Sequence, residues 1–333
     1  MNTFAVGVDV GGTYIRAGVV DELGNIRTLR QQRLPVSADQ IQVVLTATVR
    51  EAIESAESEG LVGLDSKGRV TAIGVGAAGL VDVGAGVVRF APNIGYRNFE
   101  LRKILQAEFE LPVTTDNDAT AAAYGEYRIG CEPFGIKHMV LVTLGTGIGG
   151  GLVLDGRLYR GNKGFAGEIG HILVDKNGSA CGCGQRGCWE TIASGTALGE
   201  MGRQAAREGR ADRILQLAGG DLTRLKGEHV VAAAKEGDDV AIQLMSEYAE
   251  RVAIGLAVLA NVLDPEVFVI GGGVSEAADL FLPRTAEAFA LRLQGRPYRE
   301  PIPVQAAKLG SNAGVIGAAL IALASTQSGD GAA

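Results

Sequence analysis

The residues of this sequence best suited to carry chemistry lie between positions 168 and 190. This stretch contains three of the four cysteines, one of the three histidines and the only tryptophan. Three thiolates and one imidazole at such short spacing are typical of a structural zinc site. We predict one zinc ion bound by His171, Cys181, Cys183 and Cys188. A redox pair is the alternative, but Cys181 and Cys183 are too close in sequence for a relaxed disulfide.

Two acids, Glu168 and Glu190, flank the predicted zinc ligands. Most glutamates are solvated surface residues, which is the simplest interpretation of both. Carboxylates held in place by a metal-bound loop would instead accept hydrogen bonds from the hydroxyl groups of a neutral polyol. This second interpretation predicts that the loop holds a substrate.

A glycine-rich segment at 145–150 reads Gly-Thr-Gly-Ile-Gly-Gly, which matches the dinucleotide-binding pattern G-x-G-x-x-G. That pattern must open a helix, whereas a strand and a turn follow here, so we exclude a nicotinamide site. The chain also contains no G-x-x-x-x-G-K-[ST] sequence. What remains is either an ordinary hairpin or a turn whose backbone N–H groups approach phosphate, with the Thr146 hydroxyl nearby.

A second turn of this kind, Asp9-Val-Gly-Gly-Thr13, favours phosphate binding at both. Asp9 either lies near Mg²⁺ or accepts hydrogen bonds from its own turn, and the residues alone leave these two interpretations equal. A third glycine run, Gly271-Gly-Gly273, is either a plain turn after a buried strand or a place where an adenine ring lies against the backbone.

The sequence Asp116-Asn117-Asp118 stands directly before an alanine-rich helix. Asp and Asn are preferred N-cap residues, so capping is a strong alternative to any chemical role. Three candidates nevertheless compete for one cap, and a carboxylate in the first helical turn is kept ionised by the helix dipole. We predict that Asp118 is a general base toward a hydroxyl group.

The hydrophobic pattern predicts an alternation of strands and helices. We expect strands at 4–8, 15–20, 70–75, 111–115, 139–144, 152–154, 267–270 and near 304, and helices at 41–53, 101–109, 119–127, through most of 194–263, and at 313–324. Residues 4–20 and 139–154 share one plan, in which a glycine and threonine turn joins two apolar strands. This weak repeat predicts a duplicated α/β fold.

Composition excludes several classes of function. The 333 residues are 47% hydrophobic, enough for two domains or one large one. A net charge of −7 without a basic cluster argues against binding to nucleic acid or other polyanions. The N-terminus resembles no signal peptide, and the longest apolar run is too short for a membrane span. Four cysteines in a chain of this size favour a reducing cytoplasm.

Taken together, these motifs resemble the ROK family (repressors, open reading frames, kinases) and, within it, the bacterial ATP-dependent glucokinases. The resemblance runs nearly end to end. Its most specific part is the block from Glu168-x-Gly-His171 to Cys188-x-Glu190, and the glycine turns and Ala91-Pro-Asn93 add to it. Tyr14 stands where many relatives have Lys, so any help from that Lys is absent. Ala78 stands where many have Pro, which leaves the shape of the loop Gly76–Gly79 and the substrate preference open.

The resemblance implies a duplicated actin-like (ribonuclease-H-like) fold of two domains with a sugar in the cleft between them. The smaller domain would contain residues 1–116 and 311–326. The larger domain would contain residues 117–310 with the zinc loop 171–188, and residues 327–333 would form a disordered tail. Relatives are commonly homodimers or homotetramers.

The resemblance also implies phosphoryl transfer from ATP with Mg²⁺ to the 6-hydroxyl of glucose, with Asp118 as the base. It implies sugar contacts for Asn93, Asn117, Asp118, Glu168, His171 and Glu190. It implies contacts with the nucleotide and its Mg²⁺ for Asp9, Gly11, Gly12, Thr13, Thr146, Gly147, Gly272 and Gly273.

Four alternatives stay open at this point. Another hexose, such as mannose, fructose or N-acetylmannosamine, competes with glucose as substrate, and polyphosphate competes with ATP as donor. A sugar-sensing repressor would need a helix-turn-helix before the first glycine turn, and Asp9 comes almost at once. A sugar-binding module without catalysis is disfavoured by the presence of Asp118 together with both phosphate turns.

Overall fold

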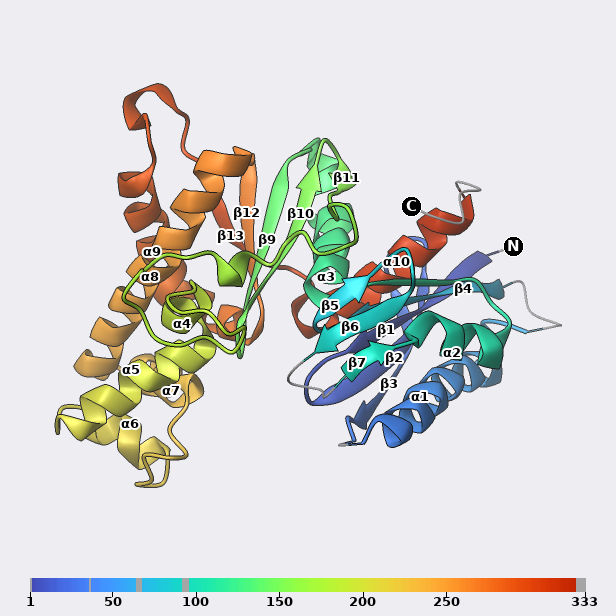
Figure 1. Ribbon diagram of the computed structural model, residues 1–333, viewed down its shortest axis with the longest axis horizontal. Coiled ribbons are helices and arrows are strands. Elements are labelled where there is room, and N and C mark those ends of the chain that lie inside the picture. Colours follow the sequence, from blue (N-terminus) through green and yellow to red (C-terminus); the bar gives the residue numbers. More distant parts are fainter. Residues whose placement is uncertain (1, 36, 64–67, 92–95, 328–333) are drawn as a thin grey trace. The chain divides into compact units, whose positions relative to one another are not determined.

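The computed structural model describes residues 2–35, 37–63, 68–91 and 96–327 (Figure 1). Contacts within the chain group it into two compact units. Unit 1 comprises Met1–Lys137, Gly151–Gly167 and Ser311–Ala333, and unit 2 comprises His138–Gly150 and Glu168–Gly310. This grouping follows contacts alone, and the domain boundary expected after residue 116 stays a prediction.

Unit 1 is built on a five-stranded sheet in the order β3-β2-β1-β4-β8. Its strands are β1 (Asn2–Val10), β2 (Tyr14–Asp21), β3 (Ile26–Arg33), β4 (Gly68–Ala77) and β8 (Val113–Asn117). The first three strands pair antiparallel, whereas β4 lies parallel to both β1 and β8. A small antiparallel sheet of β5 (Leu80–Asp82), β6 (Val87–Ala91) and β7 (Tyr96–Phe99) follows β4.

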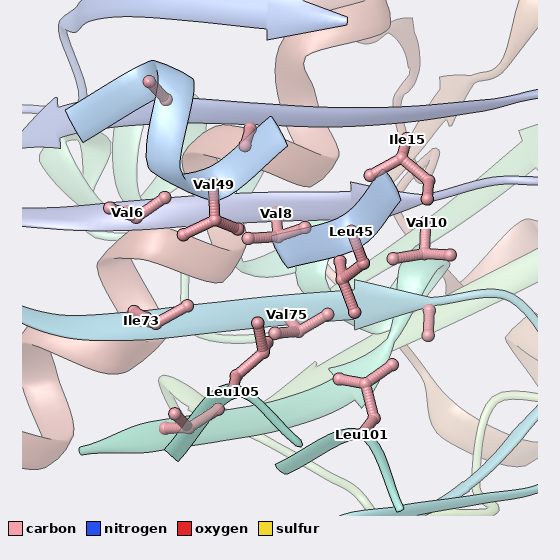
Figure 2. Close-up of a cluster of buried hydrophobic side chains, with 14 of the residues drawn as sticks. Val6, Val8, Val10, Ile15, Leu45, Val49, Ile73, Val75, Leu101 and Leu105 are labelled. Carbon is pink, nitrogen blue, oxygen red and sulfur yellow. The ribbon is translucent and has the colours of Figure 1, made fainter. Parts of the chain in front are cut away.

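Helices cover both faces of the unit 1 sheet. These helices are α1 (Ala38–Ser58), α2 (Leu101–Phe109), α3 (Asp118–Glu126) and α10 (Ala313–Gln327). Figure 2 shows Leu45 and Val49 of α1 and Leu101 and Leu105 of α2 packed on valines of β1 and β4. The residues of α1 that point inward recur at helical spacing, which is why the sequence pattern identifies this helix. The apolar helix α10 contacts β1, β4 and α3.

The second five-stranded sheet has the order β11-β10-β9-β12-β13. Its strands are β9 (Met139–Leu144), β10 (Ile148–Leu154), β11 (Arg157–Leu158), β12 (Val267–Gly271) and β13 (Val304–Ala306). In each five-stranded sheet the first strand is central, with the second and third strands on one side and two later strands on the other. This shared topology confirms the predicted duplication.

Most helices of unit 2 follow the cysteine loop. They are α4 (Glu190–Ala193), α5 (Gly195–Arg207), α6 (Asp212–Leu217), α7 (Gly227–Lys235), α8 (Asp239–Leu263) and α9 (Ala278–Arg292). Across both units, short helical turns occur at Tyr127–Cys131, Glu132–Phe134, Ile169–His171, Gly273–Ala277, Arg296–Tyr298 and Gly310–Asn312. In the part of the chain that the structure describes, no helix combines the length and apolar character needed to cross a bilayer.

Several predicted boundaries need correction. The loop expected at 145–150 is shorter, because β10 begins at Ile148 and takes up its last residues. Helix α10 continues to Gln327, so the expected tail begins inside a helix. The sequence analysis also missed β3, the small sheet of β5 to β7, and α9. These elements have short or weakly periodic apolar patterns, and α9 contains Pro283.

Candidate functional site

The four predicted zinc ligands come together in unit 2. The nitrogen and sulfur atoms that His171, Cys181, Cys183 and Cys188 offer to a metal all lie within 4.8 Å of one another. Trp189 holds one side of this loop, because its indole N–H donates to the carbonyl of Arg251 in α8 at 3.1 Å and its ring is fully buried. The predicted gathering of these residues is confirmed.

The spacing of these atoms fits a zinc ion. Zn–S bonds of about 2.3 Å at tetrahedral angles place two sulfur atoms about 3.8 Å apart, and sulfur and nitrogen about 3.6 Å apart. The Cys183 and Cys188 sulfurs are separated by 3.7 Å, and Cys181 Sγ lies 3.5 Å from His171 Nδ1. Four protein ligands fill a tetrahedral site, which is the arrangement of a structural metal.

The two flanking acids lie against His171. Its Nδ1 is 3.5 Å from Glu190 Oε1, and its Nε2 is 3.8 Å from Glu168 Oε2. Cys181 Sγ also donates to Glu190 Oε1 at 2.9 Å. Glu190 is therefore connected directly to the predicted zinc cluster. Glu168 is exposed, as the simpler interpretation predicts, and lies beside His171 at a distance longer than a hydrogen bond.

The turn between β9 and β10 approaches Glu190 at Gly147. A Cβ atom at this position would lie 2.6 Å from Glu190 Oε2. The absence of a side chain at residue 147 therefore makes room for the Glu190 carboxylate. The contact of Gly147 with phosphate through the backbone of this turn stays a prediction.

The same turn is tied to the start of α5. The N–H of Gly195 donates to the Gly145 carbonyl at 2.7 Å, and the Thr196 hydroxyl donates to the Thr146 carbonyl at 2.7 Å. Ser194 caps α5 by accepting from the N–H of Ala197. The turn is thereby held against the N-terminus of a helix, where partial positive charge favours anions.

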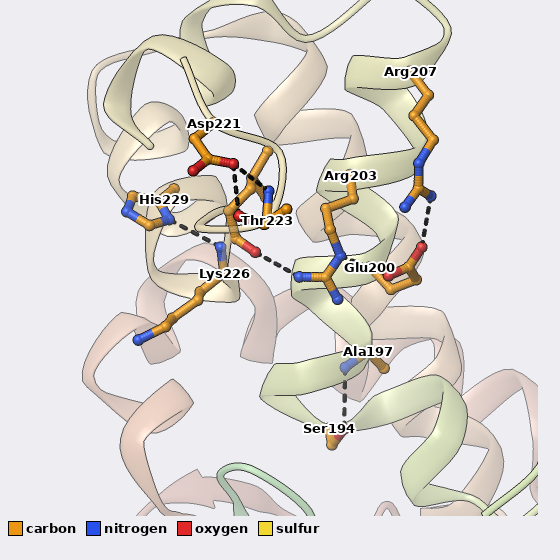
Figure 3. A network of polar contacts seen from close by, with 10 residues as sticks. Ser194, Ala197, Glu200, Arg203, Arg207, Asp221, Thr223, Lys226 and His229 are labelled. Atoms are coloured by element: carbon orange, nitrogen blue, oxygen red, sulfur yellow. Dashed lines mark hydrogen bonds and ion pairs between the residues drawn. The ribbon is translucent and has the colours of Figure 1, made fainter. Parts of the chain in front are cut away.

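A pocket of about 740 Å³ opens beside this turn within unit 2. Its lining combines the N-terminal residues of α5 and α7 with Gly273 and the cations Arg203, Lys226 and Lys235. Figure 3 shows how polar contacts hold part of this wall. Arg203 pairs with Glu200 at 2.6 Å and donates to the Leu225 carbonyl, while His229 Nδ1 accepts from the N–H of Lys226 at 2.9 Å.

The third glycine run has two distinct roles. Gly272 has a φ of +82°, and a Cβ atom there would lie 2.5 Å from the Leu144 carbonyl oxygen, so only glycine fits. Gly273 lines the pocket. The plain structural interpretation thus accounts for Gly272, and its predicted contact with adenosine stays a prediction.

Asp116, Asn117 and Asp118 in unit 1 each form different contacts. The Asn117 side chain caps α3 by accepting from the N–H groups of Ala119 and Thr120, and it donates to the Gly79 carbonyl. Asp116 forms a buried bidentate pair with Arg160 at 2.8 and 3.0 Å. Asp118 is the first residue of the helix, and its carboxylate accepts from the adjacent N–H of Ala119 at 2.9 Å.

Burial raises the pKa of Asp118, while hydrogen bonds from the Ala119 N–H and Asn117 oppose that change. Asp9 is the last residue but one of β1, and it is close enough to Asp118 for their charges to interact. Burial, and secondarily the Asp118 charge, raise the pKa of Asp9 to about 7, against a smaller effect of Arg16. The turn that follows Asp9 is exposed at Gly12 and Thr13.

We expect Asp9→Asn to stabilise the ligand-free protein more at high pH than at low pH. The folded-state pKa of Asp9 is raised to about 7 from an ordinary value of 3.8, so burial of its charge costs stability progressively between these values and fully above pH 7. Removing the charge should increase the free energy of unfolding by on the order of a few kcal/mol at pH 8, and by less than half of that at pH 5. Urea unfolding at both pH values measures this difference.

Asp21→Asn, in the same sheet, is a control for which the free energy of unfolding should change in the opposite direction. Its hydrogen bonds to Asn25, Arg27 and Leu23 outweigh burial and lower the pKa of Asp21. That stabilisation exists above the unfolded pKa and disappears as pH falls, so this variant should be destabilised at pH 8. An equal effect of Asp9→Asn at pH 5 and pH 8 would contradict the raised pKa.

Of the other residues considered in the sequence, the structure describes Cys131 but not Asn93. Asn93 lies outside the described residues, so its sugar contact is not described. Cys131 is buried, as predicted. Sequence reasoning missed Arg160 and the pocket residues Thr196, Arg203 and Lys226. For Arg160 and Arg203 no local pattern exists, whereas Ser194 before a helix start offered a capping signal near Thr196.

The sequence model of the ROK family matches residues 5–325 of this chain. The chain belongs to the ROK family. The glucokinase of Streptomyces coelicolor is 41% identical to this chain over 95% of this chain and 96% of that protein. The xylose repressor of Caldicellulosiruptor bescii is 30% identical over 94% of this chain and 76% of that protein.

Solved structures of ROK proteins share the fold. The ROK family glucokinase from Streptomyces griseus in complex with glucose and AMPPNP has a TM-score of 0.85 and 41% identity, over 96% of this chain and 99% of that one. This likeness confirms the predicted actin-like α/β fold. Both a kinase and a repressor occur among these relatives, so membership of the family does not by itself fix the activity.

Proposed function

We propose that this ROK protein is a glucokinase that transfers the γ-phosphate of ATP to the 6-hydroxyl of glucose, giving glucose 6-phosphate and ADP. The observation that carries the proposal is that residues 116, 117 and 118 form different contacts. A different residue caps the helix, and Asp116 is paired with Arg160, so Asp118 is available for proton transfer. Identity of 41% with a named glucokinase over nearly the whole chain supports glucose as the substrate.

In the proposed reaction, the 6-hydroxyl oxygen attacks the γ-phosphorus and the bond from that phosphorus to the ADP oxygen breaks. The hydroxyl proton passes to the Asp118 carboxylate, whose raised pKa suits a base that must hold a proton during transfer. The charge that develops on the phosphoryl group is neutralised chiefly by its surroundings. Backbone N–H groups of the turns at Gly11–Thr13 and at Thr146 and Gly147 serve this purpose, and Mg²⁺ near Asp9 supplies further positive charge when bound.

Glu168, His171 and Glu190 orient the sugar in this proposal. A zinc ion on His171 and the three cysteines would fix the loop, and it would supply no open coordination position. Thiols lose their protons when they bind zinc. Loss of the Cys181 proton removes the donor that contacts Glu190 Oε1, which leaves this oxygen free to accept from a sugar hydroxyl. Asn93 and Asn117 remain proposed sugar contacts.

The pocket in unit 2 is the proposed nucleotide site. It combines two helix N-termini, which favour phosphate, with Gly273, where an aromatic ring can lie against bare backbone. Gly272 remains a proposed neighbour of the adenosine. A cytoplasmic location and a homodimeric or homotetrameric assembly also remain predictions.

A coupled assay of a hexose panel tests the function. Glucose, mannose, fructose and N-acetylmannosamine are each offered with Mg-ATP and, separately, with polyphosphate. We expect the highest kcat/KM for glucose with ATP. A higher value for another hexose would change the substrate, a higher value with polyphosphate would change the donor, and sugar binding without turnover would support a regulator.

The contact between Gly147 and Glu190 gives a prediction about the substrate. Gly147→Ala should displace the flexible Glu190 carboxylate, because the new methyl group would overlap Glu190 Oε2. Loss of one hydrogen bond to a charged group should raise the KM for glucose by about tenfold or more. The KM for ATP should change much less, and steady-state kinetics with each substrate varied measure both.

Gly182→Ala is the matched control in the zinc loop, because an added Cβ atom there meets no described atom within 4 Å. It should leave both KM values unchanged. A larger rise of the KM for ATP than for glucose in Gly147→Ala would instead assign residue 147 to phosphate binding alone.

A further inference from the structure

The ion pair between Asp116 and Arg160 has no role in the chemistry described so far. Arg160 Nε lies 2.8 Å from Asp116 Oδ1, and Nη2 lies 3.0 Å from Oδ2, so both carboxylate oxygens are engaged in a planar fork. The Asp116 side chain is 4% exposed and the Arg160 side chain 18% exposed. Among the ion pairs described in this chain, no other has both partners this well shielded from water.

The pair lies at the part of the sheet that presents Asp118. Asp9, Gly76 and Asp116 pair in one row across β1, β4 and β8, and Asn117, the cap of α3, follows Asp116 directly. The end of β8 therefore fixes both the cap and the first helical residue, Asp118. A shift of Asp116 along or out of the sheet would move the base with it.

Arg160 is itself held firmly within unit 1. Its carbonyl accepts from the N–H of Ala166, and the neighbouring N–H of Tyr159 donates to the Leu152 carbonyl at 2.8 Å. Further along the same segment, the Lys163 carbonyl accepts from the N–H of Val83. The guanidinium thus reaches Asp116 from a backbone fixed on both sides, which a positioning role requires.

The electrostatics also favour a positioning role. Asp9 and Asp118 already repel each other, and an unpaired charge on Asp116 in the same region would add a third negative group. Burial raises the pKa of Asp116, and the Arg160 guanidinium acts in the opposite direction. A buried ion pair is weak evidence for stability, since apolar residues of similar volume often replace one without loss. Stability alone therefore does not explain why a buried ion pair lies beside the base.

We propose that Asp116 and Arg160 are positioning residues for the reaction, and that their buried bidentate pair holds the end of β8 so that Asp118 faces the attacking hydroxyl. This inference rests on the proposed function. Arg160 does not touch the substrate in this account. It acts through Asp116 and the backbone on Asp118.

The test is a double-mutant cycle with Arg160→Lys and Asp118→Asn, each alone and combined. Lysine keeps the charge but cannot form the bidentate fork. In the parent background we expect Arg160→Lys to lower kcat by up to ~10²-fold, the size of effect that a displacement of about 1 Å can cause, with the KM values for glucose and ATP little changed. In the Asp118→Asn background it should cause no further loss, because there is no base left to misplace.

A merely structural role gives a different result. Loss of folded enzyme would lower the rate by the same factor in both backgrounds, and thermal unfolding would report it. Equal factors in the two backgrounds, or an unchanged kcat in Arg160→Lys, would overturn the proposal. If Arg160→Lys does not fold, Asp116→Glu replaces it in the same cycle, since it keeps the charge and displaces the carboxylate.

Arg27→Lys is the matched control. Arg27 pairs with Asp21 at 2.7 Å at the opposite end of the same sheet, where Asp21 faces Phe4 of β1. This variant should leave kcat unchanged in both backgrounds. The activity of the parent enzyme distinguishes a failure of the proposed function from a failure of the positioning role. An inactive parent refutes the proposed function. An active parent with an unchanged kcat in Arg160→Lys refutes the positioning role alone.

Discussion

Asp118→Asn should lower kcat by at least ~10²–10⁴-fold, the contribution expected of a general base, while the protein stays folded. The amide has nearly the shape of the carboxylate, and its oxygen can still accept from the N–H of Ala119. The cap of α3 is unaffected because Asn117 supplies it. The variant therefore removes the proton acceptor and little else. The coupled assay at saturating glucose and ATP measures the loss.

A second effect of this variant can be measured independently of turnover. The charge of Asp118 helps to raise the pKa of Asp9, so its removal should lower that pKa. Removal of a buried charge should also leave the melting temperature equal to or higher than that of the parent. Asp239→Asn is the control, because Asp239 is likewise the first residue of a helix, α8, after a side-chain cap. Near-full activity of Asp118→Asn would refute the assignment of the base.

Much of the fold could be predicted because its patterns are local. The buried strands β9 and β12 are continuous apolar runs bounded by turn residues, and α1 repeats its buried residues at helical spacing. The zinc cluster could be predicted for the same reason, since its ligands span 171–188 and their chemistry is restrictive. Where spacing in sequence fixes spacing in the molecule, sequence reasoning succeeds.

The parts that could not be predicted depend on contacts between distant segments. Arg160 meets Asp116 across 44 positions, and only the fold brings them together. The three acidic and amide residues at 116–118 look interchangeable in sequence, yet the structure gives them three different partners. The pKa of Asp9 likewise depends on burial and on Asp118, neither of which a local pattern contains.

The other large effect is expected from Cys183→Ser, which should reduce zinc content from one ion per chain and destabilise unit 2. Cys183 is the exposed member of the cluster, so the substitution creates no buried cavity, and its effect should come from the lost ligand. Structural zinc sites contribute folding free energy directly, with apparent binding energies of roughly 10–16 kcal/mol in small zinc domains. A weakened site should therefore lower the melting temperature markedly.

The same variant should raise the KM for glucose more than the KM for ATP. Glu190 and His171 belong to the zinc group, whereas the pocket beside α5 and α7 is built from other contacts. Zinc content by elemental analysis, the melting temperature and both KM values measure the outcome, and the fluorescence of Trp189, the only tryptophan, reports loosening of the loop beside Cys188. Cys131→Ala, which replaces the cysteine outside the cluster, should retain one zinc ion per chain. A parent protein without zinc, or a Cys183→Ser variant with a full equivalent of zinc and unchanged glucose KM, would show that these four residues do not form the metal site that orients the sugar-binding acids.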